Sequence, residues 1–471
     1  MTTKFGTSGV RGLVTFLLAG DAHAYASAFA AHLVATGQVA SGGSVLIGWD
    51  LRESSPRIAE VCRVCVEDAG LSAVFCGEVP TPALALAALQ RGRPAMMITG
   101  SHIPADRNGI KFYRADGEIG KVDEVAIHAR AVSHPRVAAE AAATPDADWS
   151  NERPRVVAAY LERCANLLPP GALAGMTVGV YEHSSVARDI LHDVLRGYGA
   201  GTVALERSGH FTPVDTEAVS PETIGQLRAW AAGREFDAIV STDGDGDRPL
   251  LADSRGEIVR GDVLGILSAR MLGAATLVTP VTSNSGVERA GDWEVMRTRV
   301  GSPFVIAGME NAKLPVLGFE ANGGVLVGRG FMVEDRPLAA LETRDCIVPI
   351  LATLAAAKRA GTTVADVVAA LDLPVNASDR LQDIAPETSV ELVDILQSGG
   401  EHCARFLAGF APLASIDKTD GLRMSLADGC IVHLRPSGNA PELRCYIESP
   451  SAAQSDEMLR LCLQRAEQFK N

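Results

Sequence analysis

Three aspartates at alternate positions, Asp243, Asp245 and Asp247, are the clearest chemical feature of the sequence. They lie in STDGDGDRPL, directly after the apolar run FDAIV, so a buried strand delivers them to a loop. Three carboxylates this close repel one another unless a cation lies among them. A calcium EF-hand does not fit, because Arg248 and Ser254 stand where it needs glycine and glutamate. Mg²⁺ fits better, since few protein ligands leave room for a phosphate. The alternative is an acidic turn in solvent.

A serine and a histidine follow a second apolar run. Residues 94–98, PAMMI, read as a buried strand, and the loop TGSHIPADRNGIKFY then presents Ser101 and His102. Strand ends of this kind are where α/β proteins bind ligands. A Ser-His-Asp hydrolase would place the serine within G-x-S-x-G, which is absent here. Asp106 and Asn108 favour a turn, so Ser101 is either a turn residue or a nucleophile.

Two further loops contain arginines suited to a phosphate. In RPSGNAPELR, two arginines bracket a turn whose backbone N–H groups and hydroxyl can surround an anion. The candidates in this loop are Arg435, Ser437, Gly438, Asn439 and Arg444. A solvated hairpin is the alternative reading. Near the N-terminus, KFGTSGVRG presents Arg11 among three glycines, which suggests a fixed loop that can contact a phosphate. The alternative is a disordered segment, which is the usual expectation for a chain terminus.

A fifth loop, GFEANGGV, has the composition of a sugar-binding turn. Glu320 and Asn322 follow the apolar stretch LPVLGF. An ionised carboxylate can accept hydrogen bonds from two hydroxyl groups, which suits neighbouring hydroxyls of a sugar. A simple turn with a solvated glutamate is the alternative.

The elements that must position these loops recur along the chain. An apolar strand, an acidic residue, a serine pair and an amphipathic helix that closes at glycine occur at 44–76 and again at 176–206. A looser third copy begins at residue 274. We therefore predict three similar mixed α/β domains, which occupy residues 1–150, 151–255 and 256–370.

The last part of the sequence has a different pattern. After a linker-like stretch at 373–389, short strands separated by turns lead to a helix from about residue 452 to 469. This order predicts a C-terminal α+β domain over 371–471.

Composition limits the classes of function. The formal charge of −14 argues against nucleic-acid binding, which needs an excess of lysine and arginine. No apolar run is long enough for a membrane span, and the N-terminus lacks the features of a signal peptide, so we predict a cytoplasmic protein. Nine scattered cysteines favour reduced thiols, and the Cys62–Cys65 pair reads as a buried helix stripe.

Taken in order, the five loops resemble those of the α-D-phosphohexomutase family, most closely its bacterial members that act on mannose phosphate. The resemblance covers nearly the whole chain. It implies three α/β domains and a fourth α+β domain around a central cleft. It also implies a mutase that interconverts hexose 1-phosphate and hexose 6-phosphate, with mannose phosphate preferred and glucose or glucosamine phosphate as alternatives. Mg²⁺ would be the metal and hexose 1,6-bisphosphate the activator.

The resemblance further assigns roles to individual residues. Ser101 would carry the phosphoryl group and, with the three aspartates, hold the metal. Arg11 and Arg248 would add positive charge, and His102 or Lys111 would be the general base. We favour Lys111, because nearby arginines and a metal can lower the pKa of a lysine. The phosphosugar would be bound by Arg248, Glu320, Asn322, Arg435, Ser437, Gly438, Asn439 and Arg444.

The loops also depart from the family's usual pattern. Gly100 and Ile103 stand where many relatives have alanine and asparagine, Asn322 and Gly324 where many have serine and histidine, and Asn439 where threonine is usual. A phosphosugar-binding protein without activity is the main alternative from another class, although it would not need Ser101 beside three aspartates. The sequence leaves a monomer and a homodimer equally open.

Overall fold

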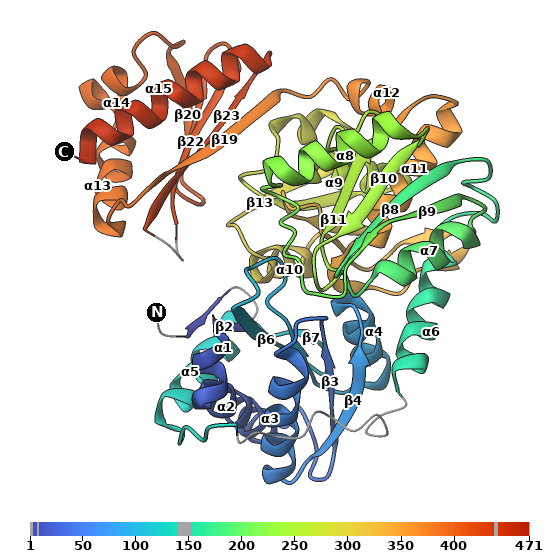
Figure 1. Cartoon of the computed structure of the whole chain (residues 1–471). Helices are drawn as coiled ribbons and strands as arrows, with labels where there is room; N and C mark the ends of the chain where they lie inside the picture. The colour runs from blue at the N-terminus through green and yellow to red at the C-terminus, as the bar shows by residue number, and fades with distance from the viewer. Residues whose placement is uncertain (1–2, 7–8, 140–151, 438–440, 471) are drawn as a thin grey trace.

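The computed structural model describes residues 3–6, 9–139, 152–437 and 441–470, which form four units along the chain (Figure 1). The first unit contains a seven-stranded sheet in the order β1-β2-β6-β5-β3-β4, with β7 paired to β6. Its strands are β1 (Lys4–Phe5), β2 (Gly9–Leu13), β3 (Ser44–Trp49), β4 (Ser72–Glu78), β5 (Ala95–Ile98), β6 (Arg107–Arg114) and β7 (Gly117–Glu118). Its main helices are α2 (Ala22–Ala35), α3 (Ser55–Asp68), α4 (Thr81–Arg91) and α5 (Lys121–Ser133).

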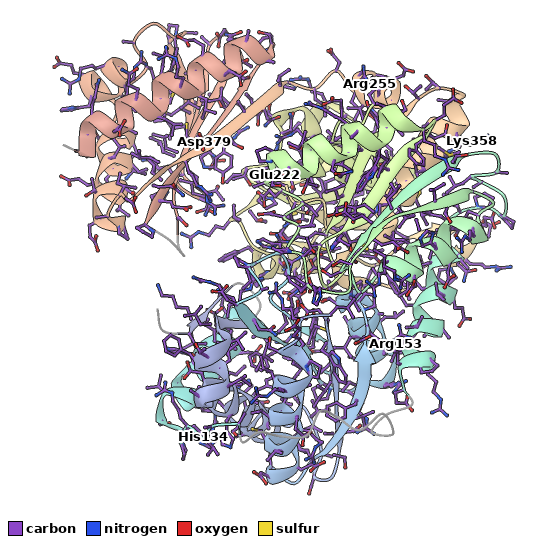
Figure 2. All side chains as sticks on the ribbon, viewed as in Figure 1. His134, Arg153, Glu222, Arg255, Lys358 and Asp379 are labelled. Atoms are coloured by element: carbon purple, nitrogen blue, oxygen red, sulfur yellow. The ribbon has the colours of Figure 1, made fainter. Side chains whose placement is uncertain are left out.

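Helix α6 (Arg153–Cys164) leads into the second unit. Arg153, labelled in Figure 2, begins this helix, and its Nε donates to the carbonyl of Glu78 at 2.8 Å. The sheet that follows has the order β11-β10-β8-β9. Its elements are β8 (Thr177–His183), α7 (Arg188–Gly197), β9 (Gly201–Arg207), α8 (Pro221–Gly233), β10 (Ala238–Thr242) and β11 (Pro249–Asp253).

The third unit contains a five-stranded sheet in the order β13-β12-β14-β15-β18. Its strands are β12 (Thr276–Pro280), β13 (Glu294–Thr298), β14 (Val316–Phe319), β15 (Val325–Val327) and β18 (Leu341–Asp345). Its helices are α9 (Gly261–Leu272), α10 (Ser302–Glu310), α11 (Ile347–Ala360) and α12 (Val364–Ala369).

One four-stranded pattern recurs in these three units, in the orders β4-β3-β5-β6, β9-β8-β10-β11 and β13-β12-β14-β15. In each, the first three strands are parallel and the fourth is antiparallel to its neighbour. The predicted repeat is therefore present, and its third copy is complete. The predicted fold class of three mixed α/β domains and a C-terminal α+β domain is confirmed.

The fourth unit has an antiparallel sheet in the order β19-β23-β22-β21-β20. Its elements are β19 (Val375–Gln382), α13 (Pro386–Gln397), α14 (Gly400–Phe406), β20 (Leu413–Asp417), β21 (Leu422–Leu426), β22 (Ile431–Pro436), β23 (Glu442–Ser449) and α15 (Ala452–Lys470). The prediction of a linker at 373–389 is wrong in its main part. Residues 375–382 pair with β23 along their whole length. Their backbone N–H and C=O groups find partners in β23, so this polar segment forms the edge strand of the sheet.

The buried side chains show how the units are joined. One cluster includes Leu46, Val178 and Leu277 and so runs through the first three sheets. A separate cluster, which includes Leu422 and Val432, belongs to the fourth unit. In Figure 1 the fourth unit lies beside the third, and Asp379 on its β19 is labelled in Figure 2. The first three units are therefore joined by a shared cluster, beside further clusters of their own, whereas the fourth unit has a separate one.

The nine cysteines are free and buried, and Cys62 and Cys65 lie in α3 as predicted. Among the helices of the described residues, none has both the length and the apolarity needed to span a membrane.

Candidate active site

Three candidate loops occupy the same position in the repeated units. The loop between β5 and β6 carries Ser101, the loop between β10 and β11 carries the aspartates, and the loop between β14 and β15 carries Glu320. In each unit this loop joins the last parallel strand to the antiparallel strand. The repeat therefore delivers three different kinds of chemistry from one topological position.

The serine loop places Ser101 against the aspartate loop. Its Oγ donates a hydrogen bond to Oδ2 of Asp243 at 2.5 Å, and its backbone N–H donates to Thr99 Oγ1 at 2.7 Å. Ser101 is buried and has a φ of 55°, a left-handed conformation that is uncommon for residues other than glycine. Such a backbone persists where the surrounding structure fixes it and is frequent at functional sites. The structure thus holds the serine hydroxyl at the aspartates.

A buried arginine that sequence reasoning did not find supports this loop. Arg52 follows β3, and its Nε donates to Asp50 Oδ2 at 3.2 Å. Its guanidinium also donates to four carbonyl groups of the serine loop, those of Ser101, Ile103, Pro104 and Arg107. A Cβ on Gly100 would lie 2.7 Å from Cζ of Arg52, so glycine at this departure from the family pattern makes room for the guanidinium. The spacing of Asp50 and Arg52 after a strand was the only sequence signal.

The aspartates form a compact cluster. Ligand oxygens of Asp243, Asp245 and Asp247 lie within 4.8 Å of one another, and all three side chains are buried. Thr81, at the start of α4, donates to Asp245 Oδ2 at 2.5 Å. Among the described residues, Oδ1 of Asp245 and Oδ1 of Asp247 are buried without a hydrogen-bond partner. Converging carboxylate oxygens without donors fit a divalent cation such as Mg²⁺.

The charges around the cluster shift the pKa values of its members in opposite directions. Burial and the two neighbouring aspartates raise the pKa of Asp243 well above its usual range. Burial also raises the pKa of Asp247, but Arg344 and Lys111 outweigh it and hold this pKa below the usual range. A cation bound at Asp243 would favour its ionised form, which couples metal binding to release of a proton.

Lys111 lies at the cluster, but it does not have the expected lowered pKa. Its Nζ is 2.6 Å from Oδ2 of Asp245 and 2.6 Å from Oδ2 of Asp247. Burial alone lowers the pKa of Lys111, and the two carboxylates raise it by more, so that its pKa lies above the usual value. Among the charges of the chain itself, the two carboxylates thus outweigh both burial and the positive charge of Arg344.

His102 and Arg248 form a pair beside Ser101. The Nδ1 of His102 is 3.0 Å from Nη1 of Arg248 and 3.2 Å from Ser101 Oγ. Because a guanidinium only donates, Nδ1 is the unprotonated nitrogen and the imidazole is neutral. Burial and the charge of Arg248 lower the pKa of His102 to about 3. The structure therefore brings an uncharged imidazole to the serine.

Arg11 completes a positively charged cavity at the same place. The cavity is lined by Arg11, Lys111, Arg248 and Arg344, together with backbone and apolar groups of β2 and β6. Burial and the charges of Arg248 and Arg344 lower the pKa of Arg11 to about 10. Cations that repel one another around a small cavity are suited to an anion such as a phosphate.

Glu320 and Asn322, in the loop between β14 and β15, are the contribution of the third unit to the site. The buried carboxylate of Glu320 accepts from Ser302 Oγ at 3.0 Å and from Nη1 of Arg344 at 2.9 Å. The side-chain oxygen of Asn322 accepts from the N–H of Gly324 at 3.0 Å, so this amide shapes the turn. Arg344 is the second functional candidate that the sequence did not reveal.

The fourth unit carries the remaining candidates. Arg435 and Arg444 lie on the paired strands β22 and β23, and their ion-pair partners are Asp420 at 4.0 Å and Glu442 at 3.8 Å. Among the described residues, the Nε atoms of both arginines are buried without a hydrogen-bond partner. Ser437 follows β22, whereas Gly438 and Asn439 lie outside the described residues. The structure thus places two arginines next to each other but in a different unit from Ser101.

The fold and these contacts are those of an enzyme that transfers a phosphoryl group: a serine, a cluster of converging carboxylates and a cavity lined by cations lie at one junction of repeated α/β units. Comparison with known families agrees. Domains I, II and III of the phosphoglucomutase/phosphomannomutase α/β/α family match residues 2–134, 158–256 and 260–372, and the C-terminal domain of that family matches residues 377–460.

Related proteins match nearly the whole chain. A phosphomannomutase of Sinorhizobium fredii is 49% identical over 465 residues, which are 96% of this chain and 97% of the relative. A phosphomannomutase of Salmonella muenchen is 40% identical over 456 residues, 95% of this chain and 92% of the relative. The crystal structure of a putative phosphomannomutase from Thermus thermophilus shares the fold, with a TM-score of 0.79, 24% identity and 99% coverage of both chains.

The chain belongs to the phosphoglucomutase/phosphomannomutase family. The prediction of a hexose phosphate mutase, an isomerase that works by phosphoryl transfer, is confirmed.

Proposed function

We propose that the chain interconverts mannose 1-phosphate and mannose 6-phosphate through a phosphoserine at residue 101. The contact between Ser101 Oγ and Asp243 carries the proposal, because it places a phosphorylatable hydroxyl at a metal-binding cluster. The names of the relatives from Sinorhizobium fredii and Salmonella muenchen support mannose phosphate as the substrate. Glucose phosphate and glucosamine phosphate are the alternatives, since the sugar loop departs from the usual pattern at Asn322 and Gly324.

The first transfer begins when the O6 hydroxyl of the hexose 1-phosphate attacks the phosphorus of phosphoserine 101. The bond from phosphorus to O6 forms while the bond to Ser101 Oγ breaks, and the hydroxyl proton leaves to a base. The product is a bound hexose 1,6-bisphosphate. The intermediate then reorients in the site, so that its O1 phosphate faces Ser101. Ser101 Oγ attacks the phosphorus at O1, the O1–phosphorus bond breaks, and O1 regains a proton. One phosphoryl group and one proton are thus conserved over the cycle.

Mg²⁺ bound by Asp243, Asp245 and Asp247 would supply charge neutralisation for the phosphoryl oxygens and the serine oxygen. Arg11, Lys111 and Arg248 surround the same cavity and orient the phosphoryl group. Such transfer depends mainly on position and charge, because its transition state is loose and needs little covalent assistance.

His102 suits the role of proton acceptor better than Lys111. Its imidazole is neutral and presents Nδ1 to Ser101 Oγ at 3.2 Å, whereas the carboxylates keep Lys111 protonated. A pKa of about 3 makes His102 a weak base, but a loose transition state releases the proton late. Lys111 then acts as a fixed positive charge.

The remaining contacts to the substrate come from the third and fourth units. Glu320 would accept hydrogen bonds from two hydroxyls of the sugar, with Asn322 holding its loop in shape. The phosphate that is not transferred would bind Arg435 and Arg444, whose Nε atoms have no partner among the described residues. Ser437, Gly438 and Asn439 would complete this phosphate site.

We further propose that hexose 1,6-bisphosphate activates the enzyme by phosphorylating Ser101. The protein would work in the cytoplasm as a monomer or homodimer, without nucleic-acid or membrane partners, in keeping with its charge of −14 and its lack of a spanning helix among the described residues. Analytical ultracentrifugation would separate the two oligomeric states.

Phosphorus NMR tests the reaction directly. The protein is incubated with Mg²⁺, a trace of glucose 1,6-bisphosphate and, in turn, mannose, glucose and glucosamine 1-phosphate. Formation of the 6-phosphate, fastest from mannose 1-phosphate, is the expected result. Release of inorganic phosphate instead would indicate a phosphatase. Unchanged spectra with all three sugars would favour a binding protein without activity.

Replacing the nucleophile provides the second test. Ser101→Ala should abolish turnover and leave the binding of mannose 1-phosphate within a few-fold of the original value, because the rest of the site remains. Ser133→Ala, at an exposed serine on α5, is the matched control. Full mutase activity in Ser101→Ala would overturn the mechanism.

A further inference from the structure

Arg344 lies at the centre of the site, although no motif marked it. It is on β18, and its buried guanidinium spans two loops. Nε and Nη2 donate to Asp247 Oδ2 at 3.1 and 2.9 Å, and Nη1 donates to Glu320 Oε2 at 2.9 Å. The same Nη1 donates to Ser302 Oγ at 2.5 Å. One cation therefore connects the metal loop to the sugar loop.

The space that Arg344 occupies is created by Gly324. A Cβ on Gly324 would lie 2.6 Å from Cδ of Arg344 and 2.7 Å from its Cγ, closer than side chains approach. Glycine at position 324 therefore makes room for an arginine that comes from another strand. In the serine loop, Gly100 makes room for the side chain of Arg52 in the same way. Arg52, however, uses all five of its N–H groups in hydrogen bonds, whereas Arg344 uses four, keeps one N–H of Nη2 and lines the cavity.

The cavity in front of Arg344 is small and has a charged lining. Its volume is about 40 Å³, roughly three times what one water molecule requires and too small for a hexose. Its charged lining consists of Arg11, Lys111, Arg248 and Arg344.

The charges favour an anion in this cavity. Lys111 and Arg344 are hydrogen-bonded to aspartates, whereas the Nε of Arg248 is 3.8 Å from Asp247 Oδ1 and is buried without a hydrogen-bond partner among the described residues. Arg248 and Arg344 also contribute to the lowered pKa of Arg11. Buried cations held this close are costly unless a negative charge joins them.

We propose that Arg344 binds the phosphoryl group during its transfer between Ser101 and the sugar, as a fourth cation beside Arg11, Lys111 and Arg248. The inference rests on the proposed mutase reaction. Arg344 forms no covalent bond and exchanges no proton, since its pKa lies well above the usual value: burial lowers this pKa, but Asp247 and Glu320 raise it by more. It donates a hydrogen bond to an oxygen of the phosphoryl group while the bond to Ser101 Oγ breaks or forms.

Single-turnover transfer tests this role. Phosphorus-labelled glucose 1,6-bisphosphate is mixed with excess enzyme, and label on Ser101 is followed over time for Arg344→Gln and Arg344→Lys. Loss of one charged donor to a phosphoryl group should slow the transfer about 100-fold in Arg344→Gln. Arg344→Lys, which retains the charge but not the planar fork, should recover part of the rate. Arg228→Gln, at an exposed ion pair on α8, is the control that should leave the rate unchanged.

A structural role would give a different pattern. Urea unfolding of each variant reports stability, and Gly324→Ala pushes the guanidinium aside without removing it. We expect Gly324→Ala to slow labelling of Ser101 while the unfolding midpoint stays close to that of the original protein. Folded Arg344→Gln and Gly324→Ala proteins that label Ser101 at the original rate would overturn the proposal.

Failure of the mutase proposal would be recognised separately. If the unaltered protein does not accept label from the bisphosphate, calorimetric titration with inorganic phosphate replaces the kinetic measurement. Weaker phosphate binding by Arg344→Gln than by the unaltered protein would then support the phosphate-binding role alone. Equal affinity of the two proteins would refute it.

Discussion

The Nζ of Lys111 lies 2.6 Å from Oδ2 of Asp245, although 134 positions separate the two residues in the sequence. This contact joins the antiparallel strand of the first unit to the metal loop of the second. It holds the Lys111 ammonium between carboxylates, and we therefore propose that Lys111 acts as a fixed positive charge rather than as the general base. The distinction can be measured.

We expect Lys111→Arg to keep the shape of the pH profile of kcat/KM between about pH 6 and pH 9, because a residue that acts as a fixed charge does not titrate there. Lys111→Met should lower kcat/KM about 100-fold at every pH in that range. Initial rates with mannose 1-phosphate provide the measurement. Disappearance of an ionisation from the profile of Lys111→Arg would instead identify Lys111 as the base.

Asp245→Asn should weaken metal binding and abolish turnover. The substitution keeps the volume and the contact with Thr81 but removes one of three converging negative charges. Titration calorimetry with Mg²⁺ measures the affinity without substrate. Asp237→Asn, at an exposed aspartate before β10, is a control for the loss of one charge. Equal Mg²⁺ affinity in Asp245→Asn and the unaltered protein would place the metal elsewhere.

His433 should make the fourth unit sensitive to acid. Burial lowers the pKa of His433 to about 4, and its Nε2 lies 2.7 Å from the carbonyl of Asp420. Between about pH 6.5 and pH 4, His433 binds a proton in the unfolded chain but not in the folded chain, so the free energy of unfolding falls as the pH falls. Above this range His433 is neutral in both states and does not affect stability. His433→Gln, which retains a donor, should therefore reduce that loss by up to about 3 kcal/mol.

Urea denaturation at several pH values checks this expectation. His402→Gln, at an exposed histidine of α14, is the matched control for the loss of an imidazole. Parallel stability curves for His433→Gln and the unaltered protein would contradict the assignment.

Heating should unfold the protein in two steps. The first three units share one buried cluster, whereas the fourth has a separate one and meets the third through contacts such as that of Glu448 with the N–H of Ser285 at 3.0 Å. We expect two calorimetric transitions, with the smaller one assigned to the fourth unit. Glu448→Gln should alter only that smaller transition. A single transition would show that the two cores unfold together.

Much of the fold was predictable because its signals are local. Apolar strands that end in polar loops, helices that close at glycine and the change of pattern near residue 371 define the repeats and the last unit. The same local signals are misleading at residues 373–389. The polar residues of β19 resemble a linker, and only its pairing with β23 makes them a strand.

The site was predictable where its residues lie in loops with distinctive spacing. Ser101 and the three aspartates belong to this group, and the structure brings them together. Arg52 and Arg344 gave almost no signal, because each lies in an ordinary charged segment and acquires its contacts only when distant strands meet. The direction of the Lys111 pKa shift was unpredictable for the same reason. It depends on which of several charged neighbours is closest, a property of the folded chain alone.

The equivalent position of the serine, metal and sugar loops has a consequence for how such enzymes diversify. Once an ancestral unit is duplicated, each copy of the loop can accumulate changes without disturbing its own sheet, since the strands on either side stay paired. The copy in the third unit can therefore change its side chains and contacts while the copies in the first two units keep theirs.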